Sequence, residues 1–141
     1  MAKAKAPSTD GVIKRKTAAK AKFPKALTAA VKAVQEKQGR DVVVLDLRTA
    51  DGFTDFFLIC TGQNSRQIAT IADAVQERLK EDFGERPAQA EGKKKSEWLL
   101  LDYFNFVVHI FSPDCRAFYG LERLWGSAER HEFVEKAPSA R

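Results

Sequence analysis

The sequence predicts a single compact α/β (α+β) domain, in which helices flank a mixed β-sheet of about four to five strands. Three observations lead to this fold class. A chain of 141 residues supports one ordinary domain, and a hydrophobic fraction of 44% is enough for a core. Apolar runs of strand length alternate with segments that carry apolar residues at helical spacing. The resulting order, helix–strand–strand–helix–(edge strand)–strand–strand–helix, is typical of helices packed against a mixed sheet.

The first predicted elements are a helix and two strands. The helix covers residues 23–39, with Pro24 in its first turn and Gly39 as its C-terminal stop. The β-branched run DVVVLDL (41–47) predicts a buried strand, and FFLICTG (56–62) predicts a second one after a polar loop.

The second helix is predicted over residues 63–84. Asn64 or Ser65 can cap its N-terminus, and Gln67 follows Asn64 at the spacing of a capping box. Gly84 is expected to end the helix. In the polar connector that follows, Pro87 allows at most a short edge strand near Ala88.

A hairpin and a last helix complete the predicted domain. The runs EWLLLD (97–102) and FVVHIF (106–111) are two strands joined by a tight turn. The run SPDCRAFYGLERLWG (112–126) is a helix with Ser112 as its N-cap and Pro113 in its first position. Its apolar face is expected to consist of Phe118, Leu121, Leu124 and Trp125.

The hairpin predicts a binding surface as well as a core. Strand alternation puts Trp98, Leu100 and Asp102 on one face, and Leu99 and Leu101 on the other. One set must face the core. We expect Trp98 and Tyr103 to form an exposed patch, because these aromatic residues are typical anchors of protein interfaces. The alternative is that the C-terminal helix covers both faces.

The basic character of the chain is concentrated at its N-terminus. Residues 1–25 carry a formal charge of +7, so residues 26–141 carry −2 of the overall +5. Residues 1–22 contain almost no large apolar side chains and are predicted to be a disordered basic tail. This tail is either an electrostatic arm for RNA or another acidic partner, or a solubilising leader. We predict the folded domain over 23–126 and a flexible C-terminal tail over 127–141.

Cysteine usage and hydropathy indicate the compartment in which the protein is expected. Cys60 and Cys115 lie far apart without CxxC spacing and are expected to be reduced thiols, which fits a reducing, cytoplasmic compartment. No apolar run approaches the ~18 residues of a membrane helix. Oligomeric state stays open between a monomer and a homodimer.

A search for catalytic chemistry finds no complete constellation. His109 lies in a strand and His131 in the expected tail, so no metal-ligand spacing is predicted. The glycine-containing loop TGQNSRQ lacks the phosphate-binding motifs. We therefore expect no enzyme, no cofactor and no metal. The alternative is a magnesium-dependent, nucleotidyltransferase-like enzyme that would use Asp46, Asp55 or Asp102, although these acids are widely spaced.

Five stretches resemble the ribosomal silencing factor family, also called the Iojap-like proteins. They are DVVVLDLR, TDFFLICTGQNSRQIATIADAVQERL, EG at 91–92, EWLLLDYFNFVVHIF and RAFYGLERLWG, which span about residues 41–126. The resemblance implies a nucleotidyltransferase-like mixed sheet without known enzymatic activity. It also implies binding to ribosomal protein fourteen of the large subunit, which blocks joining of the small subunit and represses translation, chiefly under nutrient limitation.

The resemblance implies where this partner binds. The family's contact surface includes the Trp of EW and the turn after the following strand, which correspond here to Trp98, Asp102 and Tyr103. The family usually has Gly where this chain has Phe104, and Asp where it has Asn105. A turn with positive φ suits Gly and not Phe. Either the turn shifts by one residue, or Phe104 extends the contact patch; both Phe104 and Asn105 are therefore candidate partner-binding residues.

Overall fold

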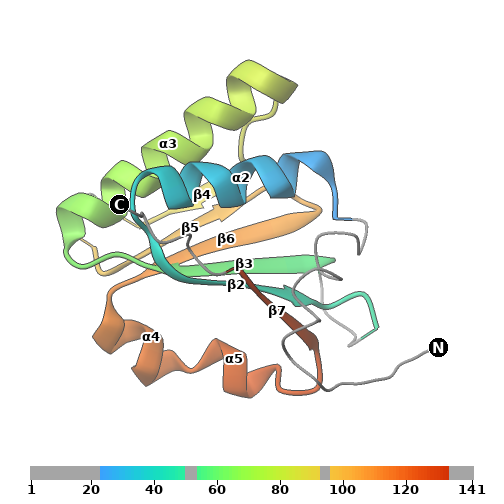
Figure 1. Ribbon diagram of the computed structural model, residues 1–141, viewed down its shortest axis with the longest axis vertical. Helices are drawn as coiled ribbons and strands as arrows, with labels where there is room; N and C mark the ends of the chain where they lie inside the picture. The colour runs from blue at the N-terminus through green and yellow to red at the C-terminus, as the bar shows by residue number, and fades with distance from the viewer. Residues whose placement is uncertain (1–22, 50–53, 93–95, 134–141) are drawn as a thin grey trace, which may run out of the picture.

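The computed structural model describes residues 23–49, 54–92 and 96–133, which form a six-stranded mixed sheet between two layers of helices (Figure 1). The elements follow in the order α2 (Lys25–Glu36), β2 (Arg40–Asp46), β3 (Phe56–Thr61), α3 (Ser65–Phe83), β4 (Gln89–Glu91), β5 (Trp98–Asp102), β6 (Phe106–Phe111), α4 (Pro113–Tyr119), α5 (Leu121–Leu124) and β7 (Glu129–Phe133). The strand order is β4-β5-β6-β3-β2-β7. The predicted fold class is confirmed, with one or two more strands than expected.

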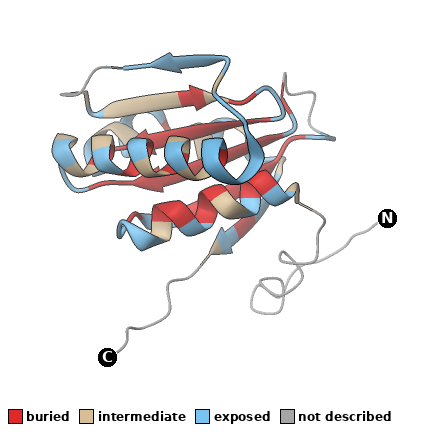
Figure 2. Ribbon diagram, turned by 90° about the horizontal axis from the view of Figure 1, so that it is seen from above, coloured by how far each residue is buried: buried red, intermediate tan, exposed pale blue. Residues whose placement is uncertain are grey.

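The middle of the sheet is its most buried part. Strands β3 and β6 pair in parallel, and the other strand pairs described are antiparallel. Every residue of β3 and β6 is buried, whereas β4 at the edge is exposed (Figure 2). A strand buried on both faces needs a helical layer on each side, because both sets of alternating side chains are apolar.

Helices α2 and α3 cover one face of the sheet, and α4 and α5 cover the other (Figure 1). The first layer buries the larger core, in which α2 and α3 contact alternate residues of the strands, among them Val44, Leu58 and Val108. The second core is smaller and contains Val43, Leu45, Leu47, Phe57, Ile59, Val107 and Phe111. None of the described helices is long and apolar enough to cross a membrane.

The predicted start and end of α3 are confirmed. The side chain of Asn64 accepts a hydrogen bond from the Gln67 backbone N–H at 2.8 Å. Gly84 has a φ of 66° in the left-handed region that favours glycine, and it ends the helix. The Gln67 side chain also donates to the carbonyl oxygens of Lys37 and Gln38, at 3.1 and 3.0 Å, so the cap joins α3 to the end of α2.

The predicted C-terminal helix is two helices. Gly120 adopts a φ of 54°, which ends α4 and begins α5. Local capping was predicted correctly, since the Ser112 hydroxyl accepts from the Cys115 backbone N–H at 3.1 Å. The break lets α5 change direction, and Trp125 after it packs edge-on against Phe57 with 6.1 Å between ring centroids.

Strand β7 corrects the prediction that residues 127–141 are a flexible tail. Residues 129–133 pair with β2, in the register Asp46 to Glu129 and Val44 to His131. The sequence ERHEF has a single large apolar residue, so its periodicity does not indicate a strand. It pairs because β2 offers an open edge of backbone hydrogen-bonding groups. Residues 1–22 and 134–141 lie outside the described residues.

A charged network fastens α4, α5 and β7 to one another. Arg116 donates to both carboxylate oxygens of Glu122, at 2.9 and 3.0 Å, and Arg130 donates to Glu122 at 2.7 Å. Arg116 also donates to the Thr61 hydroxyl and the Asp41 carbonyl, both at 2.8 Å. The hydrogen bond from Arg116 is the largest cause that lowers the pKa of Glu122.

We expect Glu122→Gln to lower the free energy of unfolding by about 1–2 kcal/mol at pH 7, the usual range for hydrogen bonds to a charged group. The pKa of Glu122 is lower in the folded state, so its contribution is complete above the unfolded value near 4.5 and is lost as the pH falls through the folded value. Urea unfolding at pH 7 and pH 3 measures the difference in the free energy of unfolding between the parent chain and Glu122→Gln. Glu132→Gln, which removes an exposed partner of Arg130, is the matched control with a change below ~0.5 kcal/mol. A difference that did not shrink at low pH would contradict this role of Glu122.

Candidate functional site

Aromatic side chains gather on the surface where β5 begins and α4 ends. Trp98 is half-buried and lies against Tyr119, with 4.7 Å between ring centroids, and against Phe111, at 4.9 Å. Phe118 stands edge-on to Tyr119 at 5.0 Å. Phe118 is 78% exposed and Tyr119 is 48% exposed. We call Trp98, Phe118 and Tyr119 the aromatic patch.

A buried histidine orients Trp98 from below. The indole Nε1–H of Trp98 donates to Nδ1 of His109 at 3.2 Å. Burial lowers the pKa of His109 to about 4, so the imidazole is neutral at physiological pH and its Nδ1 lone pair can accept. His109 is therefore a packed side chain of β6 whose Nδ1 is satisfied by Trp98. The hydrogen bond orients the Trp98 ring, the most buried member of the aromatic patch.

The aromatic patch includes Phe118, which the sequence interpretation assigned to the apolar face of the last helix. Phe118 and Leu124 were expected on the apolar face of the last helix, but Leu124 is 71% exposed and Phe118 is the more exposed of the two. Leu121 and Trp125 do pack against the second core. The reason is the break at Gly120, which rotates α4 and α5 apart so that one apolar stripe cannot serve both. Sequence periodicity had no signal for this.

The turn between β5 and β6 holds the other candidate residues. Asp102 accepts from the Phe104 backbone N–H at 2.8 Å, and the Tyr103 N–H donates to the Phe106 carbonyl at 2.8 Å. The Phe104 carbonyl accepts from the Thr54 hydroxyl at 3.1 Å. These bonds define the turn without any shift, and Phe104 itself takes a φ of 77°, in the conformation where glycine was expected.

The structure separates the five predicted site residues into two groups. Trp98 and the turn lie at opposite ends of β5, a distance of ~17 Å at the usual rise of a strand. Tyr103 is only 5% exposed and stacks on Phe106, so the expected exposed pair of Trp98 and Tyr103 is wrong. Burial raises the pKa of Tyr103 to about 12. Asp102 is half-buried, whereas Phe104 and Asn105 are exposed, with Phe104 at 82%.

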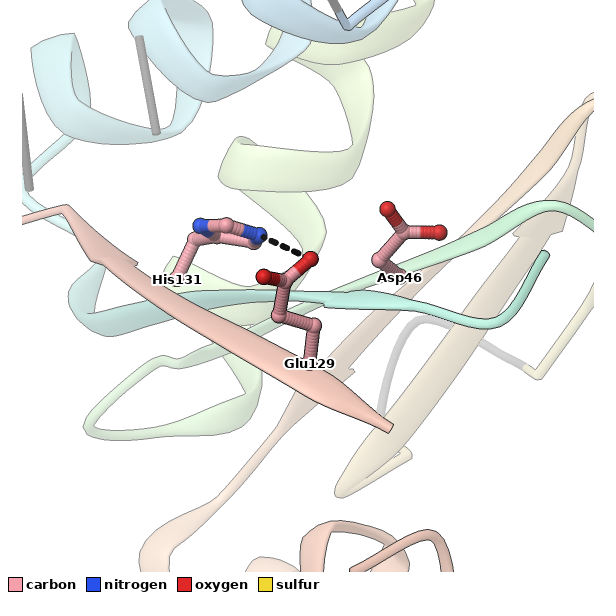
Figure 3. Close-up of side chains that lie close together, drawn as sticks. All are labelled: Asp46, Glu129 and His131. Carbon is pink, nitrogen blue, oxygen red and sulfur yellow. Dashed lines mark ion pairs between the residues drawn. The ribbon is translucent and has the colours of Figure 1, made fainter. Parts of the chain in front are cut away.

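Three side chains of types that can bind a metal lie close together elsewhere in the domain, where β2 pairs with β7. Oxygen atoms of Asp46 and Glu129 and a ring nitrogen of His131 all lie within 4.8 Å of one another (Figure 3). This corrects the expectation that His131 lies in a tail without metal-ligand spacing. Asp55 and Asp102, the other acids of the predicted magnesium alternative, do not belong to the group.

The positive φ of Phe104 predicts a difference between two substitutions that remove the same ring. Phe104→Gly abolishes the left-handed strain, which costs roughly 1–2 kcal/mol for an L-residue. Part of this gain in the free energy of unfolding is lost, because glycine raises the entropy of the unfolded chain. Phe104→Ala keeps the strain. We expect the Gly variant to be more stable than the Ala variant by about 1 kcal/mol in urea unfolding. Equal stabilities would mean that the turn relaxes out of the left-handed region.

Comparisons with known proteins relate the chain to ribosomal silencing factors. A family model described as "Ribosomal silencing factor during starvation" matches residues 20–141. The protein "Ribosomal silencing factor RsfS" from Halalkalibacterium halodurans is 39% identical over 102 residues, which cover 72% of this chain and 86% of that protein. A mouse protein named "Mitochondrial assembly of ribosomal large subunit protein 1" is 27% identical over 97 residues, covering 67% and 42% of the two chains. A crystal structure of a Chromobacterium violaceum protein superposes with a TM-score of 0.69 at 31% identity, covering 80% of this chain and 93% of that one.

Proposed function

Because the chain belongs to the ribosomal silencing factor family, we propose that it represses translation by binding the large ribosomal subunit and sterically blocking joining of the small subunit. The partner on the large subunit is ribosomal protein fourteen, and repression operates chiefly under nutrient limitation. The protein acts in the cytoplasm as a regulator without enzymatic activity. A mouse relative is named for assembly of the large subunit, which supports the choice of that subunit.

The aromatic patch is the observation that carries this proposal. Trp98, Phe118 and Tyr119 offer a rigid aromatic surface that the described part of the chain leaves uncovered on one side. Aromatic side chains of this kind dominate the energy of protein interfaces, because they bury a large area and lose little conformational entropy. We assign the centre of the ribosome-binding surface to this patch.

The turn at the far end of β5 is the second part of the proposed surface. Phe104 and Asn105 are exposed and face the partner directly, whereas Asp102 and Tyr103 hold the turn from within. A side chain kept in a strained backbone conformation and left 82% exposed has no role in the core. Contact with a partner is the role that accounts for it.

The magnesium-dependent enzyme is less well supported than the repressor. The contacts of the described residues do not bring Asp46, Asp55 and Asp102 together. Nucleotidyl transfer of the expected type needs two or three acids around a pair of ions, and Asp46 is grouped with a histidine rather than with Asp55 or Asp102. These contacts favour the regulatory function.

Removing rings from the aromatic patch should weaken binding to purified large subunits. We expect Phe118→Ala and Trp98→Ala to lower the affinity, the latter by roughly thirtyfold, as for loss of about 2 kcal/mol at an interface anchor. Pelleting with large subunits, followed by a subunit-joining assay, measures both effects. Phe83→Ala is the matched control, because Phe83 is a partly exposed ring at the end of α3, on the opposite face of the sheet.

Comparison with Phe104→Gly shows which end of β5 the partner uses, since that variant removes only the ring at the turn. Circular dichroism checks that each variant is folded, which matters most for Trp98→Ala. Full binding by a folded Trp98→Ala and a folded Phe118→Ala would refute the assignment of the patch.

The basic tail offers a separate test, of the hypothesis that it contacts ribosomal RNA. Each phosphate contact releases counterions, so the logarithm of affinity falls with the logarithm of salt concentration. Deleting residues 1–22 removes most of the local charge and should both weaken binding and flatten that dependence. An identical slope for the full and the shortened chain would leave the tail as a solubilising leader.

A further inference from the structure

The group of Asp46, Glu129 and His131 is built by the register of two neighbouring strands. Asp46 pairs with Glu129, and His131 lies two residues further along β7, opposite Val44. Because side chains two residues apart share a face, all three project to the side of the sheet that α2 covers. Figure 3 shows the His131 ring and the Glu129 carboxylate directed at one another, with Asp46 beside them.

His131 is a buried imidazole that lacks hydrogen-bond partners. The side chain is 6% exposed, and neither Nδ1 nor Nε2 has a partner within the described residues. Its closest acidic atom is Oε1 of Glu129, 3.5 Å from Nε2, too far for a good hydrogen bond. Leaving a buried polar group unsatisfied costs stability, so such a group calls for an explanation.

The distances suit a small tetrahedral ion. Zinc bonds of 2.0–2.1 Å place neighbouring ligand atoms ~3.4 Å apart, and the Nε2 to Oε1 distance is 3.5 Å. The ligand atoms of the group lie within 4.8 Å of one another, so the longest separation has to shorten by up to ~1.4 Å to reach such a geometry. The pair of His131 and Glu129 already has this spacing, so the longer separations are those to Asp46.

Arg48 shapes the site without filling it. Its guanidinium and its backbone N–H donate three hydrogen bonds to the Asp46 carboxylate, but a carboxylate has about four acceptor positions, so about one is left for an ion. Hydrogen-bonded partners of this kind hold metal-binding carboxylates in place. Two carboxylates and one guanidinium leave a net negative charge next to the neutral imidazole, which favours a divalent cation.

We propose that Asp46, Glu129 and His131 bind a divalent transition-metal ion, with zinc as the best fit, and that the ion joins β7 to β2. One imidazole and two carboxylates suit zinc, whereas magnesium and calcium prefer sites made of oxygen alone. Three protein ligands leave a fourth position for water. The ion would fasten an edge strand that has a sheet partner on one side only. This inference does not depend on the proposed function.

The test uses the untagged full-length chain with Cys115→Ser, which removes a half-buried thiol that is itself a zinc ligand type. Zinc chloride is titrated by calorimetry, and the imidazole resonances are followed by NMR. The chain has two histidines, so His109 is an internal reference. We expect one ion per chain, a shift confined to His131, a higher melting temperature with zinc, and no effect of magnesium.

Matched variants decide the result. Glu129→Gln removes an exposed ligand and should weaken zinc binding by about tenfold or more, since even indirect partners of metal sites contribute tenfold to a hundredfold. Glu132→Gln makes the same chemical change on the other face of β7 and should bind zinc like the parent chain. His131→Gln should abolish the site, with circular dichroism as the check on folding. No binding at ~100 μM zinc, an unchanged His131 resonance, or equal affinities of the Glu129 and Glu132 variants would overturn the proposal.

Discussion

The parallel pairing of β3 with β6 is the constraint on which the rest of the structure depends. Both strands are buried along their whole length, so the chain must supply an apolar layer above and below them. A parallel pair also needs a long connection, and here that connection contains α3, β4 and β5. The antiparallel hairpin of β5 with β6 then follows, and with it the position of Trp98. The position of the surface that we assign to the partner therefore follows from the parallel pairing of β3 with β6 and from the connection between these strands.

The two helical layers differ in what they leave uncovered. Helices α2 and α3 are long and shield their face, which has the larger core. The other face depends on α4 and α5, of seven and four residues. Such short helices are held by the network of Arg116, Glu122 and Arg130 more than by their own length. They cover Phe57 and Phe111 but leave Trp98 half-exposed, which is how a small domain can keep a core and still present aromatic rings to a partner.

Strand β7 links the charged features of the domain. The side chains of β7 alternate between the two faces of the sheet. Arg130 therefore joins the network of Arg116 and Glu122 on one face, while Glu129 and His131 meet Asp46 on the other. A strand with so little apolar area contributes little by burial. Ionic and hydrogen-bonded contacts on both faces of the sheet hold β7 in its position beside β2. The proposed zinc site lies where these two strands pair.

Sequence alone determined the features that depend on local patterns. Helical spacing and capping residues located α3 between Asn64 and Gly84, apolar runs located β2, β3, β5 and β6, and the quoted motifs identified the family. Only the tertiary structure decided which apolar side chains are covered, because that depends on residues distant in the chain. Tyr103 is buried by packing on Phe106, and Phe118 is exposed because the chain turns at Gly120. The strand ERHEF and the meeting of His131 with Asp46 arise from pairing with β2, a long-range hydrogen-bonding contact that leaves no period in the sequence.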